Sequence, residues 1–297
     1  MDEAPTLAKR FEEHRGHLRA VAYRMLGSLS EADDAVQEAW LRLSRSDASH
    51  VDNLRGWLTT VVARICLDLL RARRSRHEEP LEAHVPDPVV TYEDGSNPEH
   101  QTLLAEAIGL AMLVVLDRLS PAERLAFVLH DVFAVPFEEI ALLVGRSPTA
   151  ARQLASRARR RVRGADRTPD TDVRRQREVV DAFFAAVRNG DFQGLLTVLD
   201  PDVVLRADLG VVGASRVVRG AAEVARQTRP YSGFAGSGLP VLVNGAPGVL
   251  GAGDGRIHSV MAFAIRGGRI VEIDILSDPE RLSRLDLSGL DARPDEV

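Results

Sequence analysis

Apolar and polar positions follow a helical period over residues 137–163, and the pattern predicts two short helices that meet at Gly145. Ser147 is suited to cap the second helix, and Pro148 is suited to its first position. One side of the second helix is apolar: Ala151, Leu154, Ala155, Ala158 and Val162. The opposite side carries polar and basic residues: Thr149, Arg152, Gln153, Ser156 and Arg160. The pattern predicts a helix-turn-helix whose second helix fits a DNA major groove, and an αα-hairpin with a solvated basic face is the alternative.

The same period covers residues 11–76. Ser30 precedes a predicted helix whose first turn is acidic. Its buried stripe is Ala32, Ala35, Val36, Ala39 and Leu43, and its outward face, which suits a protein partner, is Asp33, Asp34, Gln37, Glu38 and Leu41. After a polar loop, Arg45–Asn53, a further helix is predicted over Leu54–Arg74. Its expected core side is Leu54, Leu58, Val61, Val62, Ile65 and Leu69, with Trp57, Arg64 and Arg71 elsewhere on its surface.

Prolines interrupt the segment His77–Pro98, which predicts an extended tether. Helices are expected again at 99–119 and after Ser120, where Pro121 and Glu123 complete a capping box.

From about Thr171 the pattern changes to an amphipathic helix, a short helix ending near Leu199, and then strands. The predicted strands are Val203–Ala207, Leu239–Asn244, Ile257–Ile265 and Ile270–Leu276. Arg266–Arg269 joins the last two as a tight hairpin. Helices followed by strands predict an α+β domain with a curved antiparallel sheet.

Charge is distributed unevenly along the chain, although the net value is only −5. Residues 145–167 hold eight arginines and one aspartate, a balance that suits phosphate binding. Residues 77–106 hold eight acidic residues and no Lys or Arg, so this segment should be kept off DNA or contact something basic. The single Cys66 excludes an internal disulfide and argues against a thiolate metal site. With no membrane-length apolar run and no signal peptide, we expect a cytoplasmic protein without metal or cofactor.

Residues 11–163 resemble bacterial extracytoplasmic-function (ECF) sigma factors. FEEHRGHLRAVAYRMLGSLSEADDAVQEAWLRL and LRGWLTTVVARICLDLLRARR are similar to their region 2, and LSPAERLAFVLHDVFAVPFEEIALLVGRSPTAARQLASRARRRV is similar to region 4. The remainder resembles a SnoaL-like domain of the NTF2-like cone fold in NGDFQGLLTVLDPDVVLRADLG, VNGAPG and GGRIVEIDILSDPERL. Sigma factors with this fused domain form the SigJ-like subgroup, also called ECF41.

The resemblance implies a multidomain chain with two all-α sigma domains and an α+β NTF2-like domain. We expect these boundaries: a region 2 domain at 1–76, an acidic linker at 77–101, a region 4 helix-turn-helix domain at 102–167, a regulatory SnoaL-like domain at 171–290 and a tail at 291–297.

A sigma factor binds the β′ and β subunits of core RNA polymerase and promoter DNA. The resemblance gives the polymerase contact to the outward face Asp33, Asp34, Gln37, Glu38 and Leu41. It gives the −10 element, read as single strand, to Ser46, Asp47, His50, Asn53, Trp57, Arg64 and Arg71. It gives the −35 element to Thr149, Arg152, Gln153, Ser156, Arg157 and Arg160, with Arg157, Arg159 and Arg160 mostly on phosphates. The acidic linker would pass through the nucleic-acid channel of the polymerase and mimic an RNA backbone.

The NTF2-like fold also hosts enzymes, which need a general base in a desolvated cone. The candidates are Asp208, His258 and Asp274, with Arg206 nearby and Tyr231 as a weak oxyanion donor. Alternation places Asp274 on the strand face of Ile270, Glu272 and Leu276, and a solvated strand edge is the favoured interpretation. We therefore expect no catalysis and leave the cone open to an unidentified small ligand.

In the subgroup the C-terminal domain contacts the sigma core and regulates it in cis. Three motifs accompany that role: the first appears as His84–Pro88 without its tryptophan, the second is reduced to Asp208–Val211, and the third is well kept as Ser277–Leu282. The resemblance gives the regulatory contacts to Asp87, Pro88, Asp208, Asp278, Pro279 and Arg281. The alternative function is a helix-turn-helix transcription regulator fused to an NTF2-fold small-molecule sensor or isomerase-like enzyme. Such a regulator would bind its operator without polymerase.

Overall fold

A computed structural model of the chain describes residues 7–46, 53–76, 83–91, 109–164, 170, 172–210, 215–228, 238–253, 256–285 and 287. The chain divides into two compact units. Unit 1 contains Met1–Glu79 and Val115–Ala165, and unit 2 contains Pro80–Val114 and Asp166–Val297. The linker predicted to be a free tether therefore clusters with the C-terminal part of the chain.

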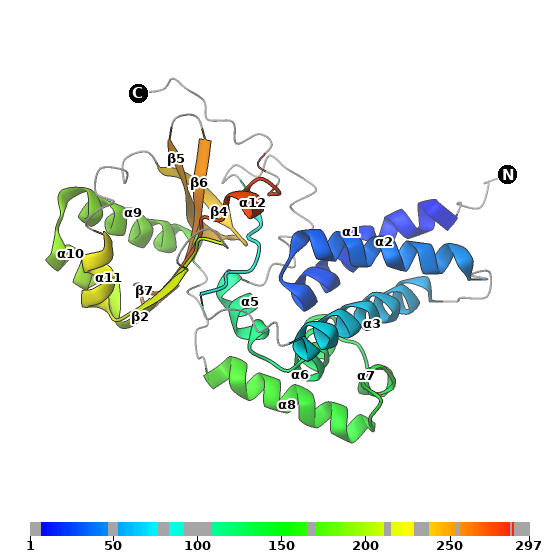
Figure 1. Cartoon of the computed structure of the whole chain (residues 1–297). Coiled ribbons are helices and arrows are strands. Elements are labelled where there is room, and N and C mark those ends of the chain that lie inside the picture. The colour runs from blue at the N-terminus through cyan, green and yellow to red at the C-terminus, as the bar shows by residue number, and fades with distance from the viewer. Residues whose placement is uncertain are drawn as a thin grey trace. The chain divides into compact units, whose positions relative to one another are not determined.

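Unit 1 begins with three helices, α1 (Leu7–Leu26), α2 (Leu29–Arg45) and α3 (Leu54–Ser75) (Figure 1). The stripe predicted for α2 is buried as expected, but the helix begins one residue before Ser30, with Ser28 at the N-cap. Gly27 has a φ of 72°, which ends α1 and turns the chain directly into α2. On α3 two expected core residues are wrong: Val61 is half-buried and Leu69 is exposed, because Cys66 and Leu67 face the core.

The rest of unit 1 is also helical. Its elements are α6 (Pro121–Phe127), the wide-turn helix η2 (Val128–Val132), α7 (Phe137–Val144) and α8 (Pro148–Gly164). The capping box of Ser120 and Glu123 is present, and Gly145 ends α7 in the left-handed conformation. Ala151, Leu154, Ala155 and Ala158 are buried and Val162 is half-buried, so the predicted helix-turn-helix is confirmed.

The two helical groups of unit 1 pack together through buried arginines. Arg124 of α6 donates from Nε to the carbonyl of Arg24 in α1 at 3.0 Å, and its Nη1 pairs with Asp117. Asp117 ends α5 (Leu110–Asp117), the helix in which the chain passes from unit 2 to unit 1. The guanidinium of Arg24 lies 4.9 Å from the ring centroid of Phe133. These cations are buried because each has a carbonyl, a carboxylate or an aromatic ring beside it.

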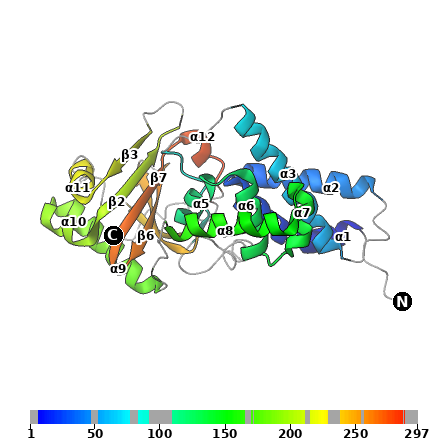
Figure 2. The ribbon, with the colours of Figure 1, turned by 90° about the horizontal axis from the view of Figure 1, so that it is seen from below.

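Unit 2 is a mixed sheet with helices packed against it (Figure 2). Its helices are α9 (Val173–Asn189), α10 (Phe192–Val198), α11 (Ala221–Thr228) and α12 (Pro279–Leu282). Its strands are β1 (Val90–Thr91), β2 (Leu199–Asp208), β3 (Arg216–Arg219), β4 (Gly238–Val243), β5 (Ala246–Gly253), β6 (Arg256–Arg266) and β7 (Arg269–Leu276). Their order is β1-β4-β5-β6-β7-β2-β3.

The expected fully antiparallel sheet is wrong at one place, because β2 and β7 are parallel. The two strands are far apart in sequence, so no hairpin constrains their direction. The predicted hairpin between β6 and β7 is confirmed, with Arg266 opposite Arg269. Its two glycines have φ values of 57° and 73°, and their N–H groups donate to the carboxylate of Asp170 at 3.0 Å each.

The two faces of the sheet differ in chemistry. One face packs against α9, α10 and α11 around Phe183 and Phe263, with Val203, Leu205 and Ile273 beneath. The other face places Arg206 of β2 beside Glu272 and Asp274 of β7. The pairing of β6 with β7 shifts by one residue, because Ala264 lies opposite Glu272 whereas the next residue, Ile265, lies opposite Ile270. As a result Ile270 is in the apolar core, on the face of the sheet that does not carry Asp274. The predicted shared face of Ile270 and Asp274 is wrong because one extra residue reverses the alternation.

Candidate functional site

The outward side of α8 has a central face made of Thr149, Gln153, Ser156 and Arg160, all of which are exposed. These residues project opposite the buried stripe, as the sequence predicts. The central face carries hydroxyl, amide and guanidinium groups, which are the groups that read base edges and phosphates in a major groove.

Arginines lie on both flanks of this central face, and carboxylates of neighbouring helices hold them. Arg157 and Arg161 both donate to Glu123, at 3.2 and 2.9 Å. On the other flank Arg159 donates to Asp131 at 2.5 Å, and Arg152 contacts Glu138 at 3.3 Å. The sequence pattern identifies Glu123 only as part of a helix cap and gives no sign of this second role.

The outward face of α2 also lies where the sequence places it. Asp33, Asp34, Gln37 and Leu41 are exposed and Glu38 is half-buried. Arg19 of α1 donates to both carboxylate oxygens of Asp33, at 2.7 and 3.1 Å, and Arg42 donates to Glu38 at 2.9 Å. The face therefore combines charged groups already fixed in position with the exposed side chain of Leu41.

Three of the expected −10 residues form a stripe along α3. Trp57, Arg64 and Arg71 are spaced by seven residues, which places them on the same side of the helix, and both arginines are exposed. Ser46 and Asn53 have local roles: Ser46 donates to the carbonyl of Leu43 at 2.8 Å, and Asn53 caps α3 by accepting from Gly56 at 2.9 Å. Asp47 and His50 lie outside the described residues.

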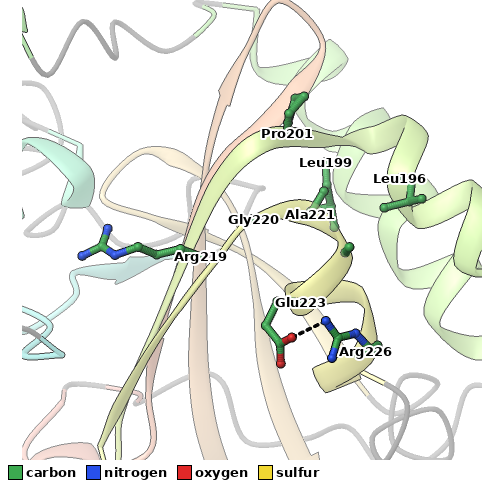
Figure 3. Close-up of a pocket in the computed structure, with 9 residues that line it drawn as sticks. Leu196, Leu199, Pro201, Arg219, Gly220, Ala221, Glu223 and Arg226 are labelled. Carbon is green, nitrogen blue, oxygen red and sulfur yellow. Dashed lines mark ion pairs between the residues drawn. The ribbon is translucent and has the colours of Figure 1, made fainter.

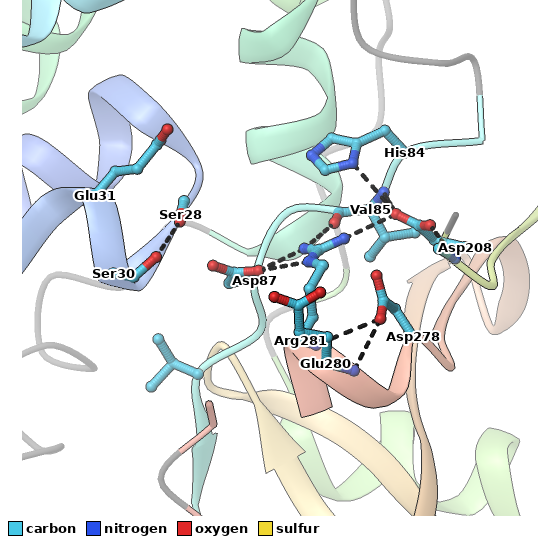
Figure 4. Close-up of polar contacts among 12 residues, drawn as sticks. Ser28, Ser30, Glu31, His84, Val85, Asp87, Asp208, Asp278, Glu280 and Arg281 are labelled. Atoms are coloured by element: carbon cyan, nitrogen blue, oxygen red, sulfur yellow. Dashed lines mark hydrogen bonds and ion pairs between the residues drawn. The ribbon is translucent and has the colours of Figure 1, made fainter. Parts of the chain in front are cut away.

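A second group of functional candidates lies within unit 2 (Figure 4). We call it the Arg281 cluster: Arg281, Asp87, Asp208, Val85 and His84. Arg281 donates to Asp87 at 2.5 and 2.9 Å, to Asp208 at 2.8 Å and to the carbonyl of Val85 at 2.6 Å. Asp208 also accepts from the amide of Val85 at 3.1 Å, and Nδ1 of His84 lies 3.2 Å from it. The cluster thus joins the three segments in which the regulatory motifs were predicted.

Neighbouring residues position the first turn of α12, which carries Arg281. Asp278 caps α12 by accepting from the amides of Glu280 and Arg281, at 2.9 and 3.4 Å. A Cβ on Gly210 would lie 2.3 Å from Oδ2 of Asp278, and Gly210 has a φ of 68°, so only glycine fits there without displacement. Pro88 is buried, whereas Pro279 is exposed at the first position of α12.

Burial would raise the pKa of Asp208, but hydrogen bonds from His84, Val85 and Gly210, together with Arg281, hold it well below its ordinary value. Asp208 is therefore ionised at neutral pH and fully engaged, so it is poorly suited to act as a base. Asp274 is not on a solvated edge as expected: its side chain is 3% exposed and accepts from Arg206 at 2.9 Å. His258 is exposed, and Tyr231 lies outside the described residues.

The linker is attached to the sheet as well as to Arg281. β1 pairs antiparallel with β4, with Val90 opposite Val243. Val89 donates to the side chain of Asn244 at 3.1 Å and accepts from its amide at 2.7 Å. The linker thus supplies an edge strand to the sheet of unit 2.

A pocket of about 520 Å³ lies where α10, the start of β2 and α11 meet (Figure 3). Leu196, Leu199 and Pro201 line it, together with the ion pair of Glu223 and Arg226. None of the candidate acid or base residues lines this pocket.

Comparison with known proteins gives matches along nearly the whole chain. The family model "Sigma-70 region 2" matches residues 10–76, and "Sigma-70, region 4" matches residues 110–162. ECF RNA polymerase sigma factor SigJ of Mycobacterium tuberculosis (strain ATCC 25618 / H37Rv) is 39% identical over 300 residues, 96% of this chain and 96% of that protein. Probable ECF RNA polymerase sigma factor SigI of M. tuberculosis (strain CDC 1551 / Oshkosh) is 35% identical over 301 residues, 97% and 100% of the two chains.

The crystal structure of the M. tuberculosis extracytoplasmic function sigma factor SigJ matches this structure with a TM-score of 0.76 at 36% identity. The match covers 94% of this chain and 99% of that chain. The expected fold, two helical sigma domains and an NTF2-like α+β domain, is confirmed, with the sheet corrected to a mixed one.

Two helical domains matching sigma regions 2 and 4, one of them a helix-turn-helix, define a transcription initiation factor. The chain belongs to the ECF RNA polymerase sigma factors. Such a factor directs core RNA polymerase to promoter DNA and is not an enzyme. Within the described residues no helix is long and apolar enough to cross a membrane.

Proposed function

We propose that the outward face of α2 binds the β′ subunit of core RNA polymerase. The support is its mixture of fixed charges and an exposed leucine, which suits a protein surface. Asp34→Arg should weaken binding of the full chain to core polymerase at least tenfold, because it places like charge at the contact. Asp181→Arg, an equal charge change at an exposed site of α9, should leave binding unchanged.

Promoter recognition is divided between the two helical groups of unit 1 in this proposal. The stripe of Trp57, Arg64 and Arg71 holds the melted −10 element with residues 46–53, because an aromatic ring and cations suit an unstacked strand. The outward side of α8, with Arg152 and Arg157 at its borders, contacts the −35 duplex. Trp57→Ala should slow promoter opening, and Gln153→Ala should reduce preference for the −35 sequence.

Activity is modulated in cis through the Arg281 cluster. The observation that carries this proposal is that one guanidinium holds both the linker, at Asp87 and Val85, and the body of the C-terminal domain, at Asp208. A linker held in this way cannot at the same moment lie in the nucleic-acid channel of the polymerase. The two placements therefore compete, and whatever weakens the cluster frees the linker for initiation.

In-vitro transcription with core polymerase tests the proposal. The full chain is compared with truncations after residue 167 and after Leu276, and with Arg281→Gln. Removing α12 or the guanidinium should change transcription in the same direction, whereas Arg284→Gln, which alters an exposed pair with Glu280 beside the cluster, should match the full chain. Equal transcription by the full chain and Arg281→Gln contradicts cis modulation.

The same assay separates a sigma factor from the alternative regulator. A sigma factor binds its promoter specifically only together with core polymerase. A gel-mobility shift of promoter DNA by the chain alone, without transcription on addition of core enzyme, would favour the regulator fused to a sensor domain. We place the protein in the cytoplasm with the polymerase. As a secondary proposal, unit 2 binds a small ligand in its cone and does not convert it chemically.

A further inference from the structure

The arginines of α8 differ in how far they are already neutralised. Among the α8 arginines whose side chains the structure describes, Arg152, Arg157, Arg159 and Arg161 each contact a carboxylate on another helix, and Arg160 does not. Arg157 and Arg161 lie on one flank of the central face, and Arg152 and Arg159 lie on the other. As far as the described side chains go, the central face, which lies opposite the buried stripe, therefore carries one uncompensated positive charge, on Arg160.

Glu123 is the best-fixed of these carboxylates. Its side chain is only 7% exposed, and it accepts from the hydroxyl of Ser120 at 2.7 Å while its own amide donates back to that hydroxyl. Burial would raise the pKa of Glu123, but the hydrogen bonds from Ser120 and the guanidinium groups of Arg161 and Arg157 lower it below its ordinary value. The carboxylate is therefore charged at neutral pH and cannot swing away from the two arginines.

The arginines, by contrast, reach Glu123 from solvent. The side chain of Arg157 is 46% exposed and that of Arg161 is 57% exposed. A phosphate at the edge of the major groove would compete with Glu123 for them. An exposed ion pair contributes little to stability, so the main consequence of this pairing concerns charge at the DNA-facing surface.

We propose that Glu123 is a specificity-determining residue: it holds Arg157 and Arg161 away from DNA phosphates and so limits sequence-independent binding by α8. This inference rests on the proposed contact of α8 with the −35 duplex. Sequence-independent affinity grows with each phosphate that the protein neutralises. Contacts to base edges do not add to this affinity, because they depend on the sequence. Holding two cations back therefore raises the relative weight of Thr149, Gln153 and Ser156 in promoter choice.

Glu123→Gln tests this with little disturbance, because glutamine also completes a capping box with Ser120. Holoenzyme made from core polymerase and the full chain is titrated with a promoter duplex and with the same duplex carrying a scrambled −35 element. Between about 50 and 200 mM salt, we expect the slope of log affinity against log salt to steepen by about one to two. The preference for the true −35 element should fall about three- to tenfold.

Three matched variants make the test decisive. Glu139→Gln makes the same charge change at an exposed site of α7, where the described residues offer no ion pair, and should leave the slope unchanged. Arg157→Gln with Arg161→Gln in the Glu123→Gln background should restore the original slope and preference. In the wild-type background Arg157→Gln should leave the slope unchanged.

Several results would overturn the inference: an unaltered or shallower slope for Glu123→Gln, an equal effect of Glu139→Gln, or a slope reduced by about 0.9 for Arg157→Gln alone. The last measurement decides the question even if Glu123→Gln does not fold. Failure of the proposed −35 contact is recognised separately, because Gln153→Ala and Ser156→Ala would then leave the −35 preference intact.

Discussion

Arg281 donates two hydrogen bonds to Asp87, a residue 194 positions earlier in the chain, at 2.9 and 2.5 Å. Their side chains are 18% and 14% exposed, so the pair is shielded from salt and water. The shared guanidinium also reaches Asp208 and the carbonyl of Val85, so this one side chain joins the linker to the C-terminal domain in addition to the pairing of β1 with β4.

Replacing Arg281 with glutamine should release the linker without unfolding the sheet. Asp87 and Asp208 would lose a charge-assisted partner in a half-buried site, at a cost of about 2–3 kcal/mol in linker attachment. Amide hydrogen exchange at Val85 and Val89 should then accelerate roughly 30- to 100-fold, and Arg284→Gln should leave it unchanged. Exchange that stays at the wild-type rate would show that β1 pairing alone holds the linker.

Gly210→Ala and Gly190→Ala form a matched pair. Both glycines have positive φ, of 68° and 62°, and both alanines should cost about 1 kcal/mol in backbone strain. Only at position 210 would the new Cβ meet Asp278, so the cap of α12 is lost and about 1 kcal/mol more is expected. Urea unfolding followed by circular dichroism measures both, and equal losses would contradict the role given to Asp278.

Asp274→Ala should strongly destabilise unit 2. The substitution removes one of the two buried carboxylates beside Arg206, whose own side chain is 3% exposed, so the guanidinium loses a charge-assisted hydrogen bond while Glu272 remains as its counter-charge. A loss of about 1.5–3 kcal/mol in the free energy of unfolding is expected, as for a hydrogen bond between charged groups. Calorimetry of this variant and of Asp181→Ala, at an exposed position, provides the comparison. A loss below about 1 kcal/mol would mean that the pair is not structural.

His17 predicts a pH dependence of unit 1. Burial, Arg55, His14 and Arg24 lower the pKa of His17 to about 4. Its Nδ1 accepts from Arg55 at 3.1 Å and its Nε2 donates to Thr59 at 3.0 Å, an arrangement that needs the neutral ring. The unfolded chain titrates near pH 6.5, so acidification from pH 7 to 5 protonates the unfolded state first and reduces stability.

The side chain of His17 is only half-buried, and solvent screening limits this loss to about 1 kcal/mol. Both tryptophans, Trp40 and Trp57, belong to unit 1, so their fluorescence in urea follows this unit alone. His17→Gln should flatten the difference between pH 7 and pH 5, whereas His258→Gln, in unit 2, should preserve it. A wild-type unit that is equally stable at both pH values would refute the assignment of the neutral ring.

Helical periodicity predicted unit 1 well because its contacts repeat every three or four residues. The cap at Ser120 and the turn at Gly145 follow from residue type alone and occur as expected, whereas the cap at Asn53 was not predicted. The prediction for Leu69 was wrong because a straight helix has 3.6 residues per turn, so an apolar pattern that repeats every seven residues rotates gradually around a long helix. The last turns of α3 therefore present a different side to the core.

Unit 2 was harder because its sheet depends on partners far away in the sequence. Because of the bulge between Ala264 and Ile265 and their partners, Asp274 and Ile270 lie on different faces of the sheet. The local sequence pattern does not predict such an extra residue. β5 was missed because glycines at 248, 251 and 253 hide its alternation, although Gly248 is required where Val243 and Met261 approach. The residues of the Arg281 cluster could be predicted from the sequence motifs, but the guanidinium geometry that joins them could not. The pairing of Glu123 with Arg157 and Arg161 was not predicted either.

β1 is separated from its partner β4 by about 150 residues of chain. A ribosome adds roughly 5–20 residues per second, so for some ten to thirty seconds after its synthesis the linker strand has no β4 to pair with. In the later part of that interval, once residue 164 has been made, the helices of unit 1 are complete and β1 still lacks its partner strand. Each newly made molecule therefore passes through a period in which its sigma domains exist before the sheet of unit 2, and the rate of translation through residues 166–243 sets its length.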